Sequence, residues 1–410
     1  MDHKRVTPHT DPESLHQSDF DADAWEALLG AMLTEYRKRH KMPWIIGFSG
    51  GKDSTVLLQA VVEMLLLLPR SERRRRVYVV CNDTMVESPI YAAFVLRTLD
   101  RLRNAFDALM LDKCMEVIVT RPALSDTFWA NLIGRGYRAP TRHMRWCTDR
   151  MKIRPTGKVI ADLTQGSGGS ILLLGVRRDE SAQRAKSIAK HDAATVDALN
   201  PHGSVRDCWV YRPIVDMTNS DVWTVLLQRR PPWGGTHRDL VTLYKNATGE
   251  CPFVVDADDA PSCGESGSAR MGCWTCTVVE KDKSLQAFID AGFEHLEPLV
   301  DFRGWIAELS EDYSKRYPVR RNGETGIGPF TMEVRREILE RLLATQREVG
   351  VELISPDEVS EIHRIWRDDA LTWAAGLVNV LHDIRGEEPV LYELSTGKKT
   401  AGVRFVPQKK

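Results

Sequence analysis

Short apolar runs alternate with longer amphipathic segments over the first half of the chain. The runs lie at 44–48, 77–81, 117–119 and 171–175. They are bounded by polar or turn-forming residues and are too short to be helices, so they predict buried strands. Segments 54–68 and 89–110 between them have the length and apolar spacing of helices. This alternation predicts a Rossmann-like α/β fold of the HUP type, a parallel sheet flanked by helices with ligands at the carboxyl ends of its strands.

Strand-like runs nearly vanish after residue 281. Segments 288–309, 331–348 and 356–383 have apolar residues at helical spacing instead, which predicts a C-terminal helical region. The first residues of the chain are polar and rich in His and Asp, a composition typical of a disordered tail. The predicted organisation is a tail at 1–22, an α/β domain at 23–255, a cysteine segment at 256–280 and a helical region at 281–410.

The composition indicates a globular protein and argues against a membrane-spanning or secreted one. The 410 residues are 42% hydrophobic and 28% charged, a globular balance, and 56 basic against 57 acidic side chains predict no overall attraction to a polyanion. The longest apolar run, 61–68, contains Glu63 and ends at Pro69, well short of the roughly 20 residues of a membrane span. With no apolar signal segment at the start, we expect a cytoplasmic protein that does not contact a membrane. Eight cysteines then indicate metal or redox chemistry.

A glycine-containing loop joins the first predicted strand to the helix that follows it. It consists of Ser49, Gly50, Gly51, Lys52, Asp53, Ser54 and Thr55. Glycines let the backbone approach an anion closely, and the N–H groups at a helix start attract phosphate. Lys52 adds a positive charge, and the hydroxyls add donors. Asp53 stands where a Walker A loop has Ser or Thr. The loop predicts a nucleotide-phosphate site, and the alternative is a glycine turn that only caps a helix.

Two further groups of polar residues follow predicted strands. Arg177, Arg178, Ser181 and Arg184 come after the run at 171–175. Arginine forks can grip phosphate bidentately, although ion pairs at a solvated helix start are the alternative. Asp83 follows the run at 77–81. With Asp53 it would offer the oxygen ligands that Mg²⁺ prefers.

The cysteines suggest a metal or cluster site. Cys273 and Cys276 form a C-x-x-C pair, and Cys263 lies ten positions upstream. Cys147 is a candidate for the fourth ligand, and Cys251 competes with it. Four thiolates suit either a structural zinc ion or a [4Fe–4S] cluster. Spacing alone leaves the two open, together with an unliganded or redox pair.

Basic residues gather in one segment of this near-neutral chain. Between Arg121 and Lys158 there are nine Lys and Arg against two Asp, with Trp129, Tyr137 and Trp146 interleaved. Such a mixture suits a nucleic-acid backbone with stacking on exposed bases. A solvated surface is the alternative.

Several motifs resemble known families. The loop at 49–54 resembles the PP-loop of the ATP pyrophosphatases, a group that includes tRNA thiolation enzymes, GMP synthetase, and PAPS and APS reductases. Asp83-Thr84 and the Gly-x-Arg-x-x-x-Ser-x-x-Arg pattern at 175–184 resemble the PAPS-reductase-like branch, with Met85 where that branch usually has Gly. Together with Arg-Trp-Cys-Thr at 145–148 and Gly-Cys-Trp-Thr-Cys-Thr at 272–277, they are similar to the DNA phosphorothioation sulfurtransferases, the DndC family and its SspD relatives.

That resemblance implies a function. ATP with Mg²⁺ would bind at 49–55 and adenylate a DNA backbone phosphate, and sulfur would then replace a non-bridging oxygen, in DNA modification of the restriction and phage-defence type. The implied partners are DNA, a cysteine desulfurase and the ATPase and nickase-like subunits of such systems. The implied cofactor is a [4Fe–4S] cluster on Cys147, Cys263, Cys273 and Cys276. The implied catalytic residues are Lys52, Asp53, Asp83, Arg177 and Arg184.

Other functions stay open on the sequence. An iron–sulfur APS or PAPS reductase fits the arginine and cysteine motifs, although the absence of a cysteine after Cys276 opposes the thioredoxin-coupled type. A zinc-stapled DNA-binding module and a tRNA thiolation enzyme are further alternatives. The motifs do not distinguish DndC from SspD.

Overall fold

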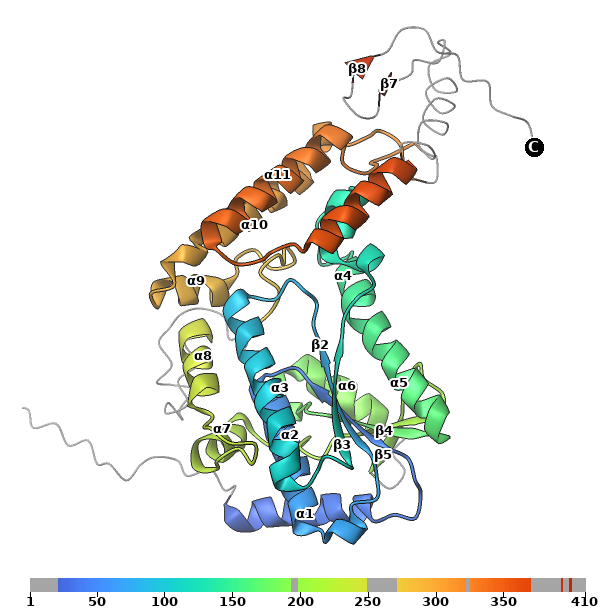
Figure 1. Cartoon of the computed structure of the whole chain (residues 1–410), viewed down its shortest axis with the longest axis vertical. Helices are drawn as coiled ribbons and strands as arrows, with labels where there is room; N and C mark the ends of the chain where they lie inside the picture. Colours follow the sequence, from blue (N-terminus) through green and yellow to red (C-terminus); the bar gives the residue numbers. More distant parts are fainter. Residues whose placement is uncertain are drawn as a thin grey trace, which may run out of the picture.

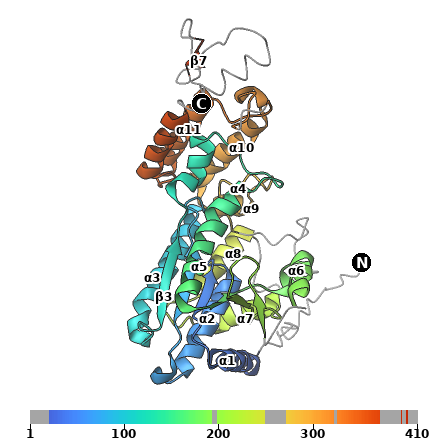
Figure 2. The same cartoon turned by 90° about the vertical axis from the view of Figure 1, so that its right-hand side faces the viewer.

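The structure is a computed structural model that describes residues 21–192, 198–248, 271–321 and 325–369, with two short strands at Tyr392–Glu393 and Lys398–Lys399. A six-stranded sheet and the helices around it form one end of the molecule, and α10 and α11 lie at the end away from α1 (Figures 1 and 2). The predicted α/β fold with a mostly parallel sheet is confirmed.

The sheet has the strand order β3-β2-β1-β4-β6-β5. All neighbours are parallel except β5, which is antiparallel to β6. The strands are β1 (Trp44–Phe48), β2 (Val77–Asn82), β3 (Met115–Thr120), β4 (Ser170–Leu174), β5 (Leu199–Pro201) and β6 (Cys208–Tyr211). The first four match the predicted runs. The last two were missed because they are short: β5 has three residues, of which two are Asn200 and Pro201, and β6 has four.

Helices cover both faces of the sheet and extend beyond it. Around the sheet they are α1 (Ala22–Tyr36), α2 (Lys52–Leu67), α3 (Pro89–Leu109), α5 (Arg154–Ser167), α6 (Ala182–Asp192), α7 (Asn219–Gln228) and α8 (Arg238–Thr248). A single turn, α4 (Trp146–Thr148), precedes α5. Beyond the cysteine segment lie α9 (Lys283–Asp290), α10 (Glu297–Glu311), α11 (Met332–Val349) and a helix at 356–369.

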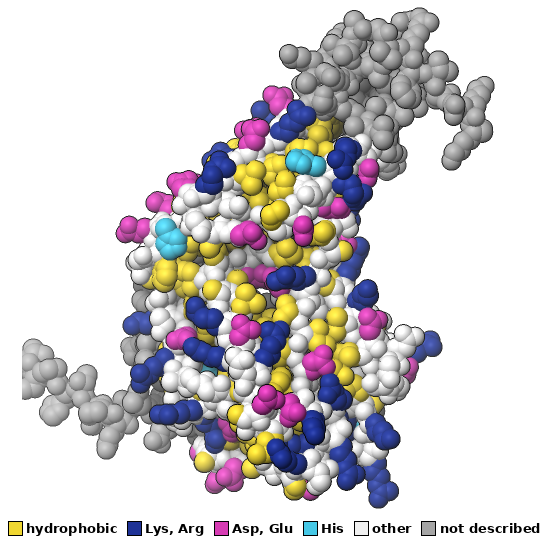
Figure 3. Space-filling view, in the orientation of Figure 1, with side chains coloured by type: hydrophobic (Ala, Val, Ile, Leu, Met, Phe, Trp, Pro, Cys, Tyr) yellow, Lys and Arg dark blue, Asp and Glu magenta, His cyan; other side chains and the backbone are white. Residues whose placement is uncertain are grey.

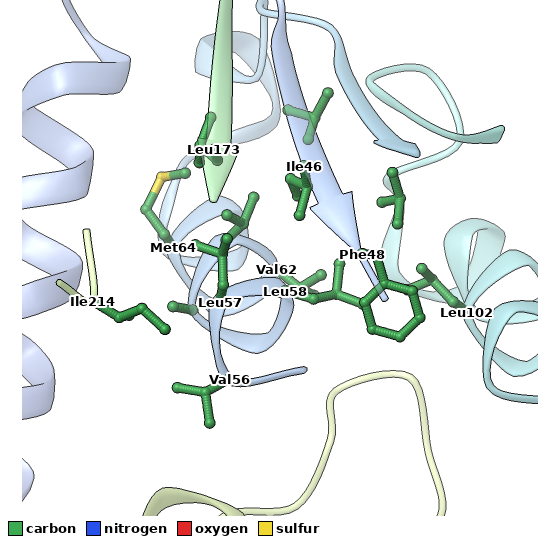
Figure 4. Packing of buried hydrophobic residues seen from close by; sticks show 14 of the residues in the cluster. Ile46, Phe48, Val56, Leu57, Leu58, Val62, Met64, Leu102, Leu173 and Ile214 are labelled. Atoms are coloured by element: carbon green, nitrogen blue, oxygen red, sulfur yellow. The ribbon is translucent and has the colours of Figure 1, made fainter. Parts of the chain in front are cut away.

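Alternate residues of β1 pack on opposite faces of the sheet. Ile46 and Phe48 point toward the apolar side chains of α2 in the main core (Figure 4). Ile45 points the other way, into a smaller core with Ile160 of α5. Helix α2 is buried almost all round because α1 and α7 also pack on it. This burial fixes the start of α2, and so the loop that precedes it, relative to the sheet.

A second core joins the C-terminal helices to the segment before α5. The ring centroid of Trp129 lies 5.8 Å from that of Trp274 and 6.0 Å from that of Phe302. All three side chains are buried. Part of the predicted α/β domain therefore packs with the helical region and with the cysteine segment. The helix predicted at 288–309 is two helices, α9 and α10, which are separated by Gly292 at a φ of +101°.

Some predictions fall outside the described residues. The tail at 1–22 does so except for Asp21 and Ala22, where Asp21 caps α1 by accepting a hydrogen bond from the N–H of Ala24. The helix predicted at 356–383 is described only as far as residue 369. Within the described part of the chain, no helix combines the length and apolar character needed to cross a membrane.

Candidate nucleotide and cysteine site

The predicted phosphate loop connects β1 to α2. Gly50 in this loop has a φ of +82°, and a Cβ there would lie 2.4 Å from Cγ2 of Val95. Both facts require glycine at this position. The hydroxyl of Tyr91 in α3 donates to the carbonyl oxygen of Ser49 at 2.7 Å. The loop is therefore held against α3 in the sharp turn that its two glycines predict.

The hydroxyls of the loop have different roles. Those of Ser54 and Thr55 donate to the carbonyl oxygen of Gly51, at 3.0 and 2.9 Å, and both residues are buried. The hydroxyl of Ser49 lies 3.1 Å from that of Ser54, and Ser49 is exposed. Ser49 is thus the exposed hydroxyl of the three predicted donors, and the other two stabilise the first turn of α2.

Two aromatic residues that the sequence analysis did not include in the site surround Lys52. Its Nζ lies 4.9 Å from the ring centroid of Tyr244 and 5.9 Å from that of Trp223, and only 7% of Lys52 is exposed. The backbone N–H of Lys52 donates to the hydroxyl of Tyr244 at 3.1 Å. No local pattern could reveal these contacts because α7 and α8 lie far from the loop in the sequence.

Two of the predicted catalytic residues contact each other. Nε of Arg177 donates to Oδ1 of Asp53 at 2.6 Å, and Nη1 donates to the carbonyl oxygen of Met217 at 3.2 Å. Arg177 is only 2% exposed. A Cβ on Gly175 would lie 2.8 Å from the carbonyl oxygen of Asp53, so glycine lets the end of β4 approach the start of α2. The Gly-x-Arg pattern thus serves to bring Arg177 to Asp53.

The remaining predicted phosphate ligands form local pairs at the start of α6. Nε of Arg178 lies 2.7 Å from Oδ1 of Asp216, and Nε of Arg184 lies 3.1 Å from Oε2 of Glu180. The hydroxyl of Ser181 accepts a hydrogen bond from the N–H of Arg184 at 3.2 Å. The structure therefore places these residues after β4, as predicted, and pairs both arginines with carboxylates. Their contact with phosphate stays a prediction.

Asp83 lies beside the phosphate loop. Phe48 of β1 pairs with Cys81 of β2, so the chains that leave these two strands start side by side at the carboxyl edge. Oδ2 of Asp83 accepts a hydrogen bond from Arg121 at 2.8 Å, and Oδ1 accepts one from the N–H of Met85 at 2.8 Å. Met85 has a φ of +65°, a left-handed conformation that favours glycine, the residue that the resemblance to the PAPS-reductase-like branch led us to expect there.

The C-x-x-C pair is joined to this same loop. Cys273 forms an antiparallel bridge with Glu87, and the N–H of Trp274 donates to the carbonyl oxygen of Val86 at 3.1 Å. The sulfur of Cys273 lies 3.5 Å from Oγ1 of Thr84. The loop after β2 therefore begins next to the phosphate loop. Further along, it contacts the cysteine segment.

The thiol of Cys276 raises the pKa of two other thiols, those of Cys147 and Cys273. Burial raises the pKa of Cys147, and the neighbouring Cys276 raises it further. Burial raises the pKa of Cys273 to about 11, and Lys152 opposes this shift. Desolvation therefore outweighs the nearby positive charge of Lys152 at Cys147. A metal that binds these thiols would have to displace their protons.

The described thiols do not complete a metal site. Among residues 21–192, 198–248, 271–321 and 325–369, no three His, Cys, Asp or Glu side chains are disposed to hold a metal ion. The predicted ligand Cys263 and its competitor Cys251 lie outside the described residues. A four-cysteine cluster site on Cys147, Cys263, Cys273 and Cys276 is thus a prediction with three of its members gathered in one region.

The predicted basic surface is smaller than its sequence suggests. Carboxylates pair with Arg121, Arg138, Arg150 and Arg154. Trp129 is buried and donates to the carbonyl oxygen of Leu353 at 2.7 Å, so its expected role in base stacking is wrong. Basic and acidic side chains are also interspersed over the face shown in Figure 3. Arg142, Arg145 and Lys152 remain exposed around the turn that carries Cys147.

Solved structures and curated proteins resemble this chain weakly. A PAPS reductase from Candida auris is 11% identical, with 52% of this chain and 88% of that chain covered and a TM-score of 0.31. The U34-tRNA thiolase NcsA from Methanococcus maripaludis, solved with its [4Fe–4S] cluster, is 13% identical, with 71% and 80% covered and a TM-score of 0.31. Likenesses of this size carry no argument about chemistry.

An uncharacterized protein of Methanocaldococcus jannaschii is 23% identical over 252 residues, which are 62% of this chain and 39% of that protein. The chain thus spans about two-fifths of the length of this curated relative.

The match to a protein family is stronger evidence than these pairwise likenesses. Residues 43–279, more than half of the chain, match the phosphoadenosine phosphosulfate reductase domain, and they include the sheet, the phosphate loop and the C-x-x-C pair. The chain therefore belongs to the phosphoadenosine phosphosulfate reductase domain family.

Proposed function

We propose that this chain is an ATP-dependent sulfurtransferase that adenylates a backbone phosphate of DNA and replaces a non-bridging oxygen with sulfur. The observation that carries the proposal is the 3.5 Å contact between Thr84 and Cys273. It brings a thiol pair to the loop that leaves the sheet beside the phosphate loop. Nucleotide activation and sulfur chemistry would then share one edge of the sheet.

The first step activates the DNA phosphate. The triphosphate of ATP binds at 49–55, where the backbone N–H groups and Lys52 face developing negative charge. A non-bridging oxygen of the DNA phosphate attacks the α-phosphorus of ATP. A new oxygen–phosphorus bond forms, the bond between the α-phosphorus and its bridging oxygen breaks, and pyrophosphate leaves. Mg²⁺ would accompany ATP, with Asp53 and Asp83 as its nearest predicted carboxylate ligands.

The second step introduces sulfur. Hydrosulfide attacks the adenylated DNA phosphorus, a phosphorus–sulfur bond forms, the bond to AMP breaks, and AMP leaves with the electron pair. The sulfur loses its proton to solvent, and no net oxidation or reduction occurs. A cysteine desulfurase with a thiol reductant would supply sulfur at this oxidation level. Cys147, Cys263, Cys273 and Cys276 would hold a [4Fe–4S] cluster, whose chemistry would be to bind the incoming sulfide.

The DNA would approach over the exposed cations near Cys147. Arg142, Arg145 and Lys152 are exposed, and Lys152 acts electrostatically on the thiol of Cys147 in the proposed sulfur site. Contacts of this kind bind phosphates without reading sequence. The target motif would then depend on partners, for which the ATPase and nickase-like subunits of phosphorothioation systems are the proposed class.

Pyrophosphate release tests the proposal. We expect purified protein with ATP and Mg²⁺ to release pyrophosphate and AMP in equal amounts, and faster with duplex DNA. Lys52→Ala should abolish the release and keep the fold, whereas Lys41→Ala, which changes an exposed lysine before β1, should leave it unchanged. Release that is unaffected by Lys52→Ala would overturn the assignment of the loop.

The family match favours one alternative, an iron–sulfur nucleotide-sulfate reductase. Such an enzyme would use the same loop for a phosphate of APS or PAPS, and a two-electron reductant would cleave the sulfur from the nucleotide as sulfite. Sulfite formation from APS or PAPS and reductant, with no pyrophosphate released from ATP, would decide for the reductase.

A further inference from the structure

A buried arginine of the helical region contacts the backbone of the cysteine segment. Arg303 lies in α10 and is only 6% exposed. Its Nε donates to the carbonyl oxygen of Cys276 at 2.7 Å, and its Nη1 donates to that of Glu280 at 3.1 Å. Its Nη2 donates to the carbonyl oxygen of Val279. One guanidinium thus fixes three carbonyl groups, the first of which belongs to the second cysteine of the pair.

The other end of the C-x-x-C turn is held by the sheet domain. Cys273 bridges to Glu87, and the N–H of Cys276 donates to the carbonyl oxygen of Cys273 at 3.0 Å. The side chain of Trp274, between the cysteines, is buried in the second core. The turn that carries both thiols therefore has its first residue fixed by the loop after β2 and its last residue fixed by Arg303.

The environment of Arg303 indicates that its main structural role is to bind the carbonyl groups of the cysteine segment. The charge of Arg303 acts on Asp282, where it opposes the rise in the carboxyl pKa that burial causes, but the direct contacts of the guanidinium are with backbone carbonyl groups. A buried charge is costly unless it is paired or hydrogen-bonded, and this one donates hydrogen bonds to three carbonyl groups of the cysteine segment. The planar fork of arginine reaches several acceptors at once, which the single ammonium of lysine does less well.

We propose that Arg303 is a positioning residue for the sulfur-transfer site. It holds the Cys276 end of the C-x-x-C turn, so that the two thiols keep a fixed separation before any group binds to them. The use of these thiols in sulfur transfer rests on the function proposed above, whereas the holding of the turn is a property of the chain alone. The helical region thereby holds one end of the C-x-x-C turn, and the loop after β2 holds the other.

Thiol reactivity tests this role without any bound group. The full chain is treated with a chelator, and the rate of alkylation by iodoacetamide is measured at each cysteine by peptide mass spectrometry. Local opening sets the reactivity of a half-buried thiol, so we expect Arg303→Gln to raise the rate at Cys276 by about tenfold. Arg303→Lys, which keeps one donor, should give an intermediate rate. Cys81, buried in β2, reports on global unfolding and should stay unreactive in both variants.

A matched control separates positioning from general stability. Arg316 is also buried in the helical region, but it donates to the carbonyl oxygen of Gly328 rather than to the cysteine segment. Arg316→Gln should leave the rate at Cys276 within twofold of the wild type. An equal increase in Arg316→Gln and Arg303→Gln, or none in either Arg303 variant, would overturn the proposal. The alkylation assay requires no nucleotide. A failed pyrophosphate assay in the wild type would therefore refute the proposed function and not this role of Arg303.

Discussion

The hydroxyl of Tyr244 accepts a hydrogen bond from the backbone N–H of Lys52, 192 positions away in the sequence, at 3.1 Å. This N–H is one of the donors at the start of α2 that a phosphate would use. The ring of Tyr244 also lies 4.9 Å from Nζ of Lys52. Tyr244 of helix α8 therefore occupies one donor of the predicted phosphate site, and a nucleotide bound there would compete with the phenol for this donor.

Removal of that hydroxyl should strengthen nucleotide binding. In Tyr244→Phe the aromatic ring remains beside Lys52, but the N–H becomes available to phosphate. The net free energy of one hydrogen bond is about 1 kcal/mol, which predicts a Kd for ATP about fivefold lower. Tyr91→Phe is the matched control, because its hydroxyl donates to the carbonyl oxygen of Ser49 and supports the loop instead. We expect weaker binding there. Titration calorimetry would measure both, and a decrease in affinity in both variants would contradict the competition.

The ion pair of Asp53 and Arg177 should contribute strongly to folding stability. Asp53→Asn would remove the closer carboxylate partner of Arg177, which is 2% exposed, and leave its Nη1 with the half-exposed carboxylate of Asp179 at 3.4 Å. The loss of one partner of a buried pair is costly, so we expect a decrease of about 2 to 4 kcal/mol in the free energy of unfolding. Urea denaturation followed by circular dichroism would measure it.

The adjacent pair of Arg178 and Asp216 provides the comparison. The side chain of Asp216 is 77% exposed, and exposed pairs contribute little. Asp216→Asn should therefore change the free energy of unfolding by less than about 0.5 kcal/mol. Equal effects of the two substitutions would show that the burial of Arg177 does not matter to the pair.

The fold was predictable from local patterns to the extent that those patterns are set by burial. Strands β1, β2 and β4 are largely buried and apolar, so continuous runs marked them, and β3 at the edge of the sheet keeps a shorter apolar run over 117–119. Strand β5, at the edge of the sheet, is three residues long and contains Asn200 and Pro201, and β6 beside it has only four residues, so neither stood out as a strand. Gly50 and Gly175 were informative because the left-handed φ of the first and the close approach of backbone at the second exclude other residues.

The partners of the site residues could not be predicted in the same way. Arg177 was expected to bind phosphate, but its guanidinium contacts Asp53 through a close approach of β4 to α2. Trp129 was expected at the surface because of its basic neighbours, but it packs with residues more than a hundred positions away. The contact of Arg303 with Cys276 joins two regions that sequence periodicity treats as separate. Long-range packing decides each of these, and periodicity reports only local structure.

Stability should fall below neutral pH because of His237. Burial lowers the pKa of this residue to about 4, and its Nε2 lies 2.6 Å from Oε1 of the buried Gln59. The histidine is neutral in the folded chain but takes up a proton near pH 6.5 when unfolded. The stabilisation is therefore fully present above pH 6.5 and is lost as the pH falls toward 4.

The size of this effect follows from the two pKa values. Between pH 7 and pH 5 the wild type should lose about 2 kcal/mol more free energy of unfolding than His237→Gln, which has no proton to take up. Urea denaturation at the two pH values would measure the difference. His143→Gln, which replaces an exposed histidine, should show the wild-type dependence. Parallel losses in the wild type and in His237→Gln would rule out this histidine as the cause.

The sharp turn of the phosphate loop should tolerate no side chain at Gly50. An alanine there would adopt a φ of +82° and place its Cβ 2.4 Å from Cγ2 of Val95. The left-handed conformation and the steric overlap together predict a loss of about 2 to 4 kcal/mol in the free energy of unfolding.

Because Gly50 shapes the loop, ATP binding should be lost even at temperatures where Gly50→Ala is folded. Gly157 of α5 has nothing within 4 Å of an added Cβ, so Gly157→Ala should keep ATP binding and stabilise the helix by about 0.5 to 1 kcal/mol. If folded Gly50→Ala bound ATP as the wild type does, the anion site would have to lie elsewhere than in this turn.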